Sequence, residues 1–294
     1  MGEFVNVTKL PDLPARAAHA HKGTFGTVIV VGGTAMMIGA PALCAAAALR
    51  GGSGLVKIAA PQGVVPFAIA IEPSATGIII GASVDEDLAQ LDAADPDSRA
   101  VLAVGPGMGI SSESHHFVNA LLRGGRQMVL DADGLNHLAT WGRTRPLPGP
   151  KLVITPHPGE FARLAQPLGI RGDPTDPLSR PTAATAMAQA HSAVVVLKGH
   201  RTVVSDGRRM YVNNTGNVAL ASAGSGDILT GLLASLMAQG MTTFDAAVLA
   251  VYLHGLAADL WVKQLGPSGL TAHDLARKIP QAIEQHRRQT GATK

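Results

Sequence analysis

The stretch TVIVVG, residues 27–32, decides the fold of this chain. It is a continuous, mostly β-branched apolar run that ends at glycine, which is typical of a strand buried on both faces of a sheet. The alanine-rich segment 40–49 then predicts a helix, and residues 55–60 predict the next strand. A strand, a helix and a second strand in this order indicate the βαβ unit of a parallel sheet.

The same alternation continues toward the C-terminus. Further strands are expected at residues 78–80, 100–104, 127–130, 151–154, 193–197, 202–205 and 210–212, the last two as a hairpin around Asp206-Gly207. Further helices are expected at residues 64–71, 113–123, 159–165, 182–190, 227–238, 244–263 and 271–284. The sequence therefore predicts an α/β protein whose mostly parallel central sheet carries helices on both faces.

The proline-rich segment 173–181 is the one clear loop, and the alternation resumes after it. We therefore expect a single domain over residues 1–294, with an N-terminal extension over about residues 1–20 and a frayed tail over about residues 286–294.

Composition and charge exclude several classes of protein. Hydrophobic residues make up 46% of the 294 and charged residues 15%, so the chain can bury a large core and is not disordered. The net charge is +3, but the basic residues are scattered and aromatic residues are only 3%, so we expect no nucleic-acid partner.

Targeting signals and disulfides are not expected either. The lone cysteine, Cys44, lies in an apolar run and is interpreted as a core residue. Residues 1–8 lack the apolar core of a signal peptide. The longest apolar stretch, taken as residues 38–49, is shorter than the roughly 20 residues of a membrane span. We expect a soluble, cytoplasmic protein without a membrane partner.

Ligands of open α/β sheets bind beyond the carboxyl ends of the strands, and several unusual motifs fall there. The strongest is GSGD, residues 224–227, at the start of an apolar helix. Backbone N–H groups at a helix start attract anions, and Asp227 is suited to act as a general base on a hydroxyl that attacks a phosphate. The alternative is an ordinary helix cap after a glycine turn.

Two further motifs carry charged side chains. Lys198, in KGHRT at the end of a strand, can pair with a phosphate or can be a solvated turn lysine. In TPHPGE, residues 155–160, Glu160 can orient hydrated magnesium and His157 can contact a substrate. Their alternatives are a helix-start carboxylate and a surface histidine.

Three glycine- or aspartate-rich motifs give weaker signals. GPGMG, residues 105–109, allows a close backbone approach to a ligand or forms a simple turn. Asp131 and Asp133 follow a strand, and Asp133 is interpreted as a helix N-cap. The glycines after the first strand do not form GxGxxG, so no Rossmann dinucleotide fingerprint is present.

The combination of these motifs resembles the ADP/ATP-dependent NAD(P)H-hydrate dehydratases of the ribokinase-like superfamily. The resemblance runs from about Lys22 to about Leu275 and is carried by KGTFGTVIVVGG, ALRGGSGLVKIAAP, VGPGMG, LDADGLN, TPHPGEF, VLKGHRTVVSDG and AGSGDILTGLLASLMAQG. It implies that a nucleotide phosphorylates the ring hydroxyl of hydrated nicotinamide dinucleotide and that phosphate is then eliminated. ADP is the donor it favours over ATP.

The resemblance also implies roles for particular residues. Asp227 is similar to the family's base, and Gly224, Ser225 and Gly226 to its anion hole. The nucleotide would contact Lys198, Gly199, His200, Arg201, Thr202 and Gly226. The NAD(P)H hydrate would contact Ala40, Gly107 or Gly109, His157 and Asp227. Glu160 is similar to the superfamily's magnesium-orienting glutamate. A homotetramer is implied, and no N-terminal epimerase domain is expected.

Two other functions remain open on the residues. A ribokinase-fold kinase of a small vitamin precursor shares GSGD and KG but would release a stable phosphate ester. A catalytically silent nucleotide-binding protein would show no turnover, although the presence of Asp227 argues against it.

Overall fold

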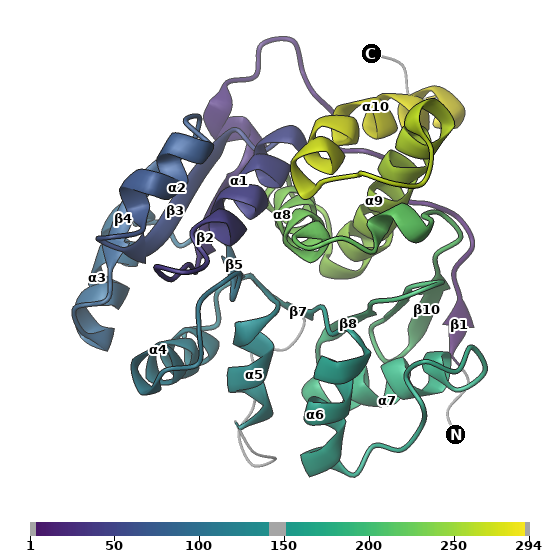
Figure 1. Cartoon of the computed structure of the whole chain (residues 1–294), viewed down its shortest axis with the longest axis horizontal. Coiled ribbons are helices and arrows are strands. Elements are labelled where there is room, and N and C mark those ends of the chain that lie inside the picture. The colour runs from purple at the N-terminus through teal and green to yellow at the C-terminus, as the bar shows by residue number, and fades with distance from the viewer. Residues whose placement is uncertain (1–3, 141–150, 292–294) are drawn as a thin grey trace.

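The computed structural model describes residues 4–140 and 151–291 and contains a ten-stranded sheet with the order β1-β10-β9-β8-β7-β6-β5-β2-β3-β4 (Figure 1). The strands are β1 Val5–Asn6, β2 Thr27–Val31, β3 Leu55–Pro61, β4 Thr76–Ile80, β5 Val101–Val104, β6 Met128–Leu130, β7 Leu152–Ile154, β8 Val194–Leu197, β9 Val203–Ser205 and β10 Arg209–Val212. Neighbouring strands are parallel except for the β8–β9 and β9–β10 pairs. The mostly parallel α/β sheet and the hairpin are thus as predicted.

The strand order reverses direction beside β2. The chain first adds β3 and β4 on one side of β2 and then adds β5 to β8 on its other side. The loops that follow β2 and β5 therefore start at the carboxyl ends of two adjacent strands and run in different directions. Such a reversal is where open α/β sheets form a crevice for ligands.

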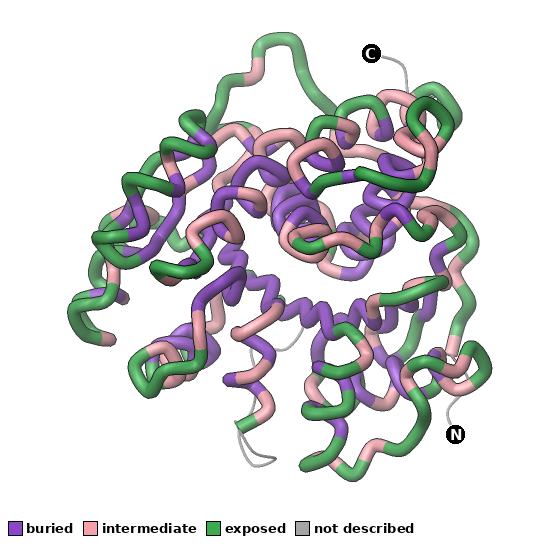
Figure 2. Tube along the Cα trace, in the orientation of Figure 1, coloured by how far each residue is buried: buried purple, intermediate pink, exposed green. Residues whose placement is uncertain are grey.

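Helices cover both faces of the sheet (Figure 1). One layer consists of α1 Gly39–Arg50, α2 Val65–Ile71, α8 Ser225–Ala238, α9 Thr243–Leu265 and α10 Ala272–Thr290. The other consists of α3 Val84–Ala94, α4 Ser112–Arg123, α5 Asp133–Ala139, α6 Pro158–Leu168 and α7 Arg180–His191. Alternate residues of β2 enter the two cores, Val28 on one side and Ile29 on the other. Figure 2 shows the buried strands between these layers.

The structure adds elements that the sequence pattern did not predict. Strand β1 pairs with β10, so part of the expected N-terminal extension joins the sheet. Helix α3 begins after Ser83, whose side chain accepts the N–H of Glu86, a signal that was readable in the sequence. Helix α10 continues to Thr290, so the prediction of fraying from about residue 286 is wrong over that range. Residues 1–3 and 292–294 of the expected extension and tail lie outside the described residues.

Helix α9 is long and apolar enough to cross a membrane by length and composition. Helix α9 is therefore a longer apolar segment than residues 38–49. The prediction that residues 38–49 are the longest apolar stretch is wrong. Within the fold, 61% of its most apolar window is buried, and its partly buried Leu260, Trp261 and Val262 pack on the core. In this structure α9 has the burial of a core helix.

Candidate functional site

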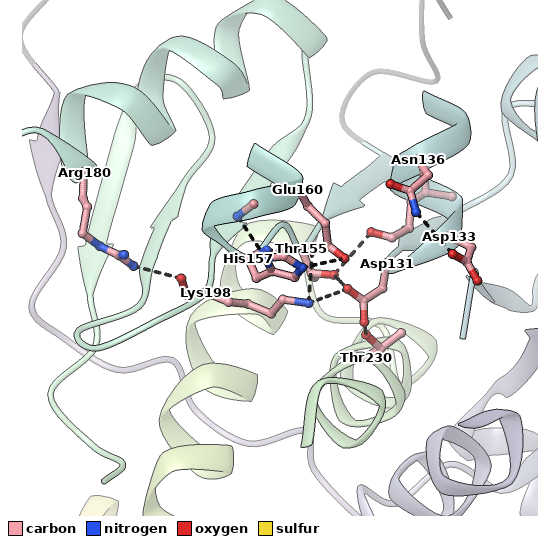
Figure 3. Close-up of polar contacts among 11 residues, drawn as sticks. Asp131, Asp133, Asn136, Thr155, His157, Glu160, Arg180, Lys198 and Thr230 are labelled. Atoms are coloured by element: carbon pink, nitrogen blue, oxygen red, sulfur yellow. Dashed lines mark hydrogen bonds and ion pairs between the residues drawn. The ribbon is translucent and has the colours of Figure 1, made fainter. Parts of the chain in front are cut away.

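Polar side chains from four segments meet at the carboxyl ends of β6, β7 and β8 (Figure 3). Asp131 follows β6, Thr155 follows β7 and Lys198 follows β8, while Thr230 reaches the same point from α8. Adjacent parallel strands end at one edge of the sheet, so residues far apart in sequence become neighbours there.

Asp131 is the centre of this cluster and is only 2% exposed. Its Oδ1 accepts hydrogen bonds from Thr155 Oγ1 at 2.7 Å and from Lys198 Nζ at 2.6 Å, and its Oδ2 accepts one from Thr230 Oγ1 at 2.7 Å. Burial opposes the charge of Asp131, but the ammonium of Lys198 and these hydrogen bonds together hold the pKa of the carboxyl below its usual value. Asp131 is therefore a charged, fully partnered carboxylate.

Lys198 is held between two carboxylates. Its Nζ also lies 3.7 Å from Glu160 Oε2, and its side chain is only 19% exposed. Burial acts to lower the pKa of Lys198, but Asp131 and Glu160 outweigh it and raise the pKa. The alternative of a solvated turn lysine is therefore wrong. A Cβ built on Gly226 would lie 3.6 Å from Nζ, so the start of α8 passes close to this ammonium.

Glu160 and His157 begin helix α6 with a reciprocal cap. The backbone N–H of His157 donates to Glu160 Oε2 at 2.7 Å, and the N–H of Gly159 donates to His157 Nδ1 at 3.0 Å. Both alternatives thus hold in part, because Glu160 is a helix-start carboxylate and the His157 side chain is 51% exposed. Burial raises the pKa of Glu160, and Lys198 opposes that shift.

The GSGD motif forms the first turn of α8. Gly224 is the N-cap residue with φ +83°, and a Cβ there would lie 2.8 Å from Leu43 Cδ1 and 2.9 Å from Ala272 Cβ. Glycine is needed both for the left-handed backbone and for this close approach. Because Gly224 occupies the cap position, the alternative reading of Asp227 as an ordinary helix cap is wrong.

Asp227 has an unusual acidity. Burial and the nearby charge of Asp131 raise the pKa of its carboxyl to about 7, against the opposing effect of Lys198. A carboxylate with a pKa near the working pH is suited to general-base chemistry.

The thiol of Cys44 is buried and its pKa is raised by that burial, as expected of a core residue.

The start of α8 is held by two groups that the sequence did not single out, the carbonyl of Leu220 and the ring of His254. Ser225 Oγ donates to the carbonyl of Leu220 at 2.9 Å, and His254 Nε2 lies 2.9 Å from the carbonyl oxygen of Ser225. Burial lowers the pKa of His254 to about 4, so this ring is neutral at pH 7. His254 lies on α9, almost thirty residues away, and no local motif marks it.

The loops after β2 and β5 touch each other. Gly107 has φ +62°, and a Cβ there would lie 2.8 Å from the Met37 carbonyl and 3.1 Å from Ala40 Cβ. The N–H of Gly109 donates to Asp133 Oδ2 at 2.8 Å. The prediction of Asp133 as an N-cap is wrong, because Ala132 holds that position and the Asp133 carboxylate links α5 to the Gly109 loop.

Arg180 holds the KGHRT segment through hydrogen bonds to its backbone, and the sequence analysis did not identify this residue. Arg180 is 4% exposed and donates from Nη2 to the carbonyls of Leu197 at 2.9 Å and Lys198 at 3.2 Å. Gly199 has φ +139°, and a Cβ there would lie 2.9 Å from Arg180 Nη1. Within the segment, His200 and Arg201 are exposed and Thr202 Oγ1 donates to the Gly199 carbonyl.

The described residues thus form two zones along one edge of the sheet. The β6–β8 zone holds Lys198, Glu160, Gly226 and Asp227, and the β2–β5 zone holds Ala40, Gly107 and Gly109. In residues 4–140 and 151–291, no group of three or more His, Cys, Asp or Glu side chains is placed to hold a metal ion. Any metal here would rely on Glu160 and on groups brought by a ligand.

Comparisons with known proteins identify relatives of this chain. A family model described as NAD(P)H-hydrate dehydratase matches residues 28–281. The ADP-dependent (S)-NAD(P)H-hydrate dehydratase of Neisseria meningitidis is 42% identical over 89% of this chain and 86% of that protein. The chain also matches bifunctional NAD(P)H-hydrate repair enzymes but spans only about half their length, 52% in Moorella thermoacetica.

Solved structures give the same picture. A ribokinase-like protein of Enterococcus faecalis superposes with a TM-score of 0.79 at 22% identity and covers 93% of this chain and 92% of its own, which shows the fold. The ADP/ATP-dependent NAD(P)H-hydrate dehydratase of Bacillus subtilis, co-crystallised with ATP and Mg²⁺, has a TM-score of 0.75 at 30% identity, with coverages of 93% and 94%. The predicted ribokinase-like fold is confirmed.

Proposed function

We propose that this chain, which belongs to the NAD(P)H-hydrate dehydratase family, uses an adenine nucleotide to convert NAD(P)H hydrate back to NAD(P)H. The observation that carries the proposal is Asp227, a carboxylate with a pKa of about 7 at the glycine-lined start of α8, beside the Lys198–Asp131 ion pair. Asp227 takes the proton of the ring hydroxyl as the hydroxyl oxygen attacks the terminal phosphoryl group of the nucleotide. The bond from that phosphorus to the bridging oxygen breaks, and AMP leaves from ADP, or ADP from ATP. The C–O bond then breaks, phosphate leaves with the bonding pair, and the adjacent carbon loses a proton to form the ring double bond.

We propose the remaining roles from the resemblance to the family, and the two zones are consistent with them. The backbone N–H groups of Gly224, Ser225 and Gly226 stabilise the charge of the transferred phosphoryl group. Residues 198–202 and Gly226 hold the nucleotide. Ala40, the Gly107–Gly109 loop and His157 hold the dinucleotide. The start of α8 supports these roles because helix N-termini favour anions.

Magnesium belongs to the same proposal. Magnesium keeps several waters and is bound through one or two carboxylates together with substrate phosphates. Glu160 would be the carboxylate for this use: its Oε2 accepts the N–H of His157, and its Oε1, 3.5 Å from His157 Nε2, accepts no hydrogen bond from the described residues and so is the oxygen that a metal-bound water could reach. When bound through water to Glu160, magnesium would neutralise charge on the nucleotide phosphates.

The proposed function is tested by the near-ultraviolet absorbance of the dihydronicotinamide ring, which hydration removes. Purified protein, magnesium and NADH hydrate are mixed with ADP and, separately, with ATP. We expect a nucleotide-dependent rise in absorbance with release of inorganic phosphate. The nucleotide that gives the faster reaction, ADP or ATP, is the preferred phosphoryl donor. A stable phosphate ester without the rise would instead indicate a small-molecule kinase. Nucleotide binding without either product would indicate a silent binding protein.

The raised pKa of Asp227 predicts the pH dependence of the reaction. Only the ionised carboxylate accepts a proton, so kcat/KM should rise through about pH 7 and level off above it. Below this point we expect a loss of about tenfold per pH unit. The measurement is kcat/KM for NADH hydrate at saturating nucleotide across neutrality, and a profile that stays flat would contradict the assigned base.

A further inference from the structure

A cavity of about 380 Å³ opens at the carboxyl ends of β2 to β5, beside the zone that holds Ala40 and Gly107. Its walls come from the ends of β3 and β4, from the loops after β2, β4 and β5, and from the first two turns of α3 and α4. It therefore lies where the strand order of the sheet reverses, the position at which open α/β sheets take ligands. None of the roles proposed above uses its far wall.

The walls combine apolar side chains with two carboxylates. Met108, Ile80 and Phe117 are among the apolar lining residues. Asp87 lines the cavity as well and is 7% exposed, and its Oδ1 accepts the N–H of Gly81 at 2.7 Å and of Ala82 at 3.3 Å. No lysine or arginine is among its lining residues, and His116 is the one histidine there.

Glu113 is the second carboxylate of the cavity. Its own backbone N–H and the Ser111 side chain donate to it and lower the pKa of the carboxyl, so Glu113 is ionised at pH 7. With Asp87 it gives this pocket an acidic wall. Such a wall accepts hydrogen bonds from sugar hydroxyls and repels phosphate dianions.

The cavity continues along the sheet edge from the site of chemistry. Gly109 lines it, while Gly107 in the same loop contacts Ala40. The N–H of Gly109 also donates to Asp133, the first residue of α5, which lies two positions after Asp131. A dinucleotide whose nicotinamide ring lies at Asp227 needs a second binding place for its other half, and this cavity is the neighbouring one.

We propose that this cavity binds the adenosine half of the hydrated dinucleotide, and that Glu113 and Asp87 make the chain prefer NADH hydrate over NADPH hydrate. The inference rests on the proposed function. A carboxylate beside the adenosine ribose accepts a hydrogen bond from a free 2′-hydroxyl, as in NAD-binding folds, whereas a 2′-phosphate at the same place meets like charge.

The preference is tested by steady-state kinetics with both hydrates. We expect a KM at least about tenfold lower for NADH hydrate than for NADPH hydrate, the effect of one unfavourable charge contact. Glu113→Lys should reduce this ratio about tenfold or more, chiefly by lowering the KM for NADPH hydrate. Asp97→Lys makes the same charge change at an exposed site before the amino-terminal end of β5, whereas the cavity lies at the carboxyl ends of the strands. This control variant should leave the ratio unchanged.

Occupancy of the cavity is tested separately by Ala82→Trp. Ala82 is an exposed lining residue, so a larger side chain there fills the cavity without entering the core. We expect about a tenfold rise in KM for both hydrates and no change in KM for the nucleotide. An unchanged KM for both hydrates would overturn the assignment of the cavity to adenosine.

A binding measurement separates this inference from the proposed function. Fluorescence titration with NADH and NADPH reports their dissociation constants whether or not the protein turns over a hydrate. We expect NADH to bind more tightly than NADPH, and we expect Glu113→Lys, but not Asp97→Lys, to reduce this preference. That result would support adenosine binding in the cavity even if the absorbance assay shows no dehydration. Equal binding of NADH and NADPH by the unaltered chain, or equal effects of the two lysine variants, overturns the proposal.

Discussion

Asp227→Asn is expected to lower kcat by about 10³ while leaving the dissociation constant of the nucleotide nearly unchanged. The amide keeps the shape of the side chain but cannot accept the hydroxyl proton. Burial and the neighbouring charge of Asp131 bring the pKa of Asp227 to about 7, so the substitution removes a base tuned to neutral pH. Turnover by the absorbance assay and nucleotide affinity by calorimetry measure the two quantities on the same preparation.

A matched control is Asp245→Asn. Asp245 occupies the first turn of α9 as Asp227 occupies the first turn of α8, but it pairs with the exposed Thr242 hydroxyl at 2.7 Å. Its substitution should leave turnover within about twofold of the unaltered chain, as is usual for surface sites. If Asp227→Asn retained most of its turnover, the general-base assignment would be wrong and another group would have to take the proton.

The parallel sheet and the motifs at its edge could be predicted because their signals are local. A β-branched run that ends at glycine, such as residues 27–32, predicts both a strand and the residue at which the strand ends. The GSGD motif indicates the start of a helix, and Gly224 supplies the left-handed backbone conformation found at its N-cap. Helix α3 was equally local, and its Ser83 cap with three acidic residues in the first turn was overlooked.

The partners of the charged residues could not be predicted because they are set by the sheet. Lys198 and Asp131 are 67 positions apart, and only the parallel alignment of β6 to β8 brings Nζ to 2.6 Å from Oδ1. Asp131 was therefore a candidate without a role, while Lys198 was interpreted through its neighbours in sequence. The same holds for Arg180 and His254, whose contacts are with distant carbonyl groups.

Asp131→Asn is expected to destabilise the fold by about 3 to 5 kcal/mol, the usual cost of removing one partner of a buried ion pair. The change leaves the ammonium of Lys198 with Glu160 at 3.7 Å as its remaining carboxylate among the ion pairs of the described residues, and it weakens the acceptors of Thr155 and Thr230. Urea denaturation measures the free energy of unfolding. Asp97→Asn, which alters an exposed pair with Arg99 at 3.7 Å, serves as the control and should change it by less than about 1 kcal/mol.

Two further measurements identify the cause of that loss. Adding Lys198→Met to Asp131→Asn removes the unpaired charge, so the double variant should be more stable than Asp131→Asn alone. The pKa of Asp131 is below its usual value in the fold, so its ion pair contributes fully above the unfolded pKa of about 4 and is lost as the pH falls through the folded value. The difference between Asp131→Asn and the unaltered chain should therefore persist from neutral pH down to about 4 and shrink in stronger acid. A difference that shrank between pH 8 and pH 6 would show that another titrating group, and not Asp131, is responsible.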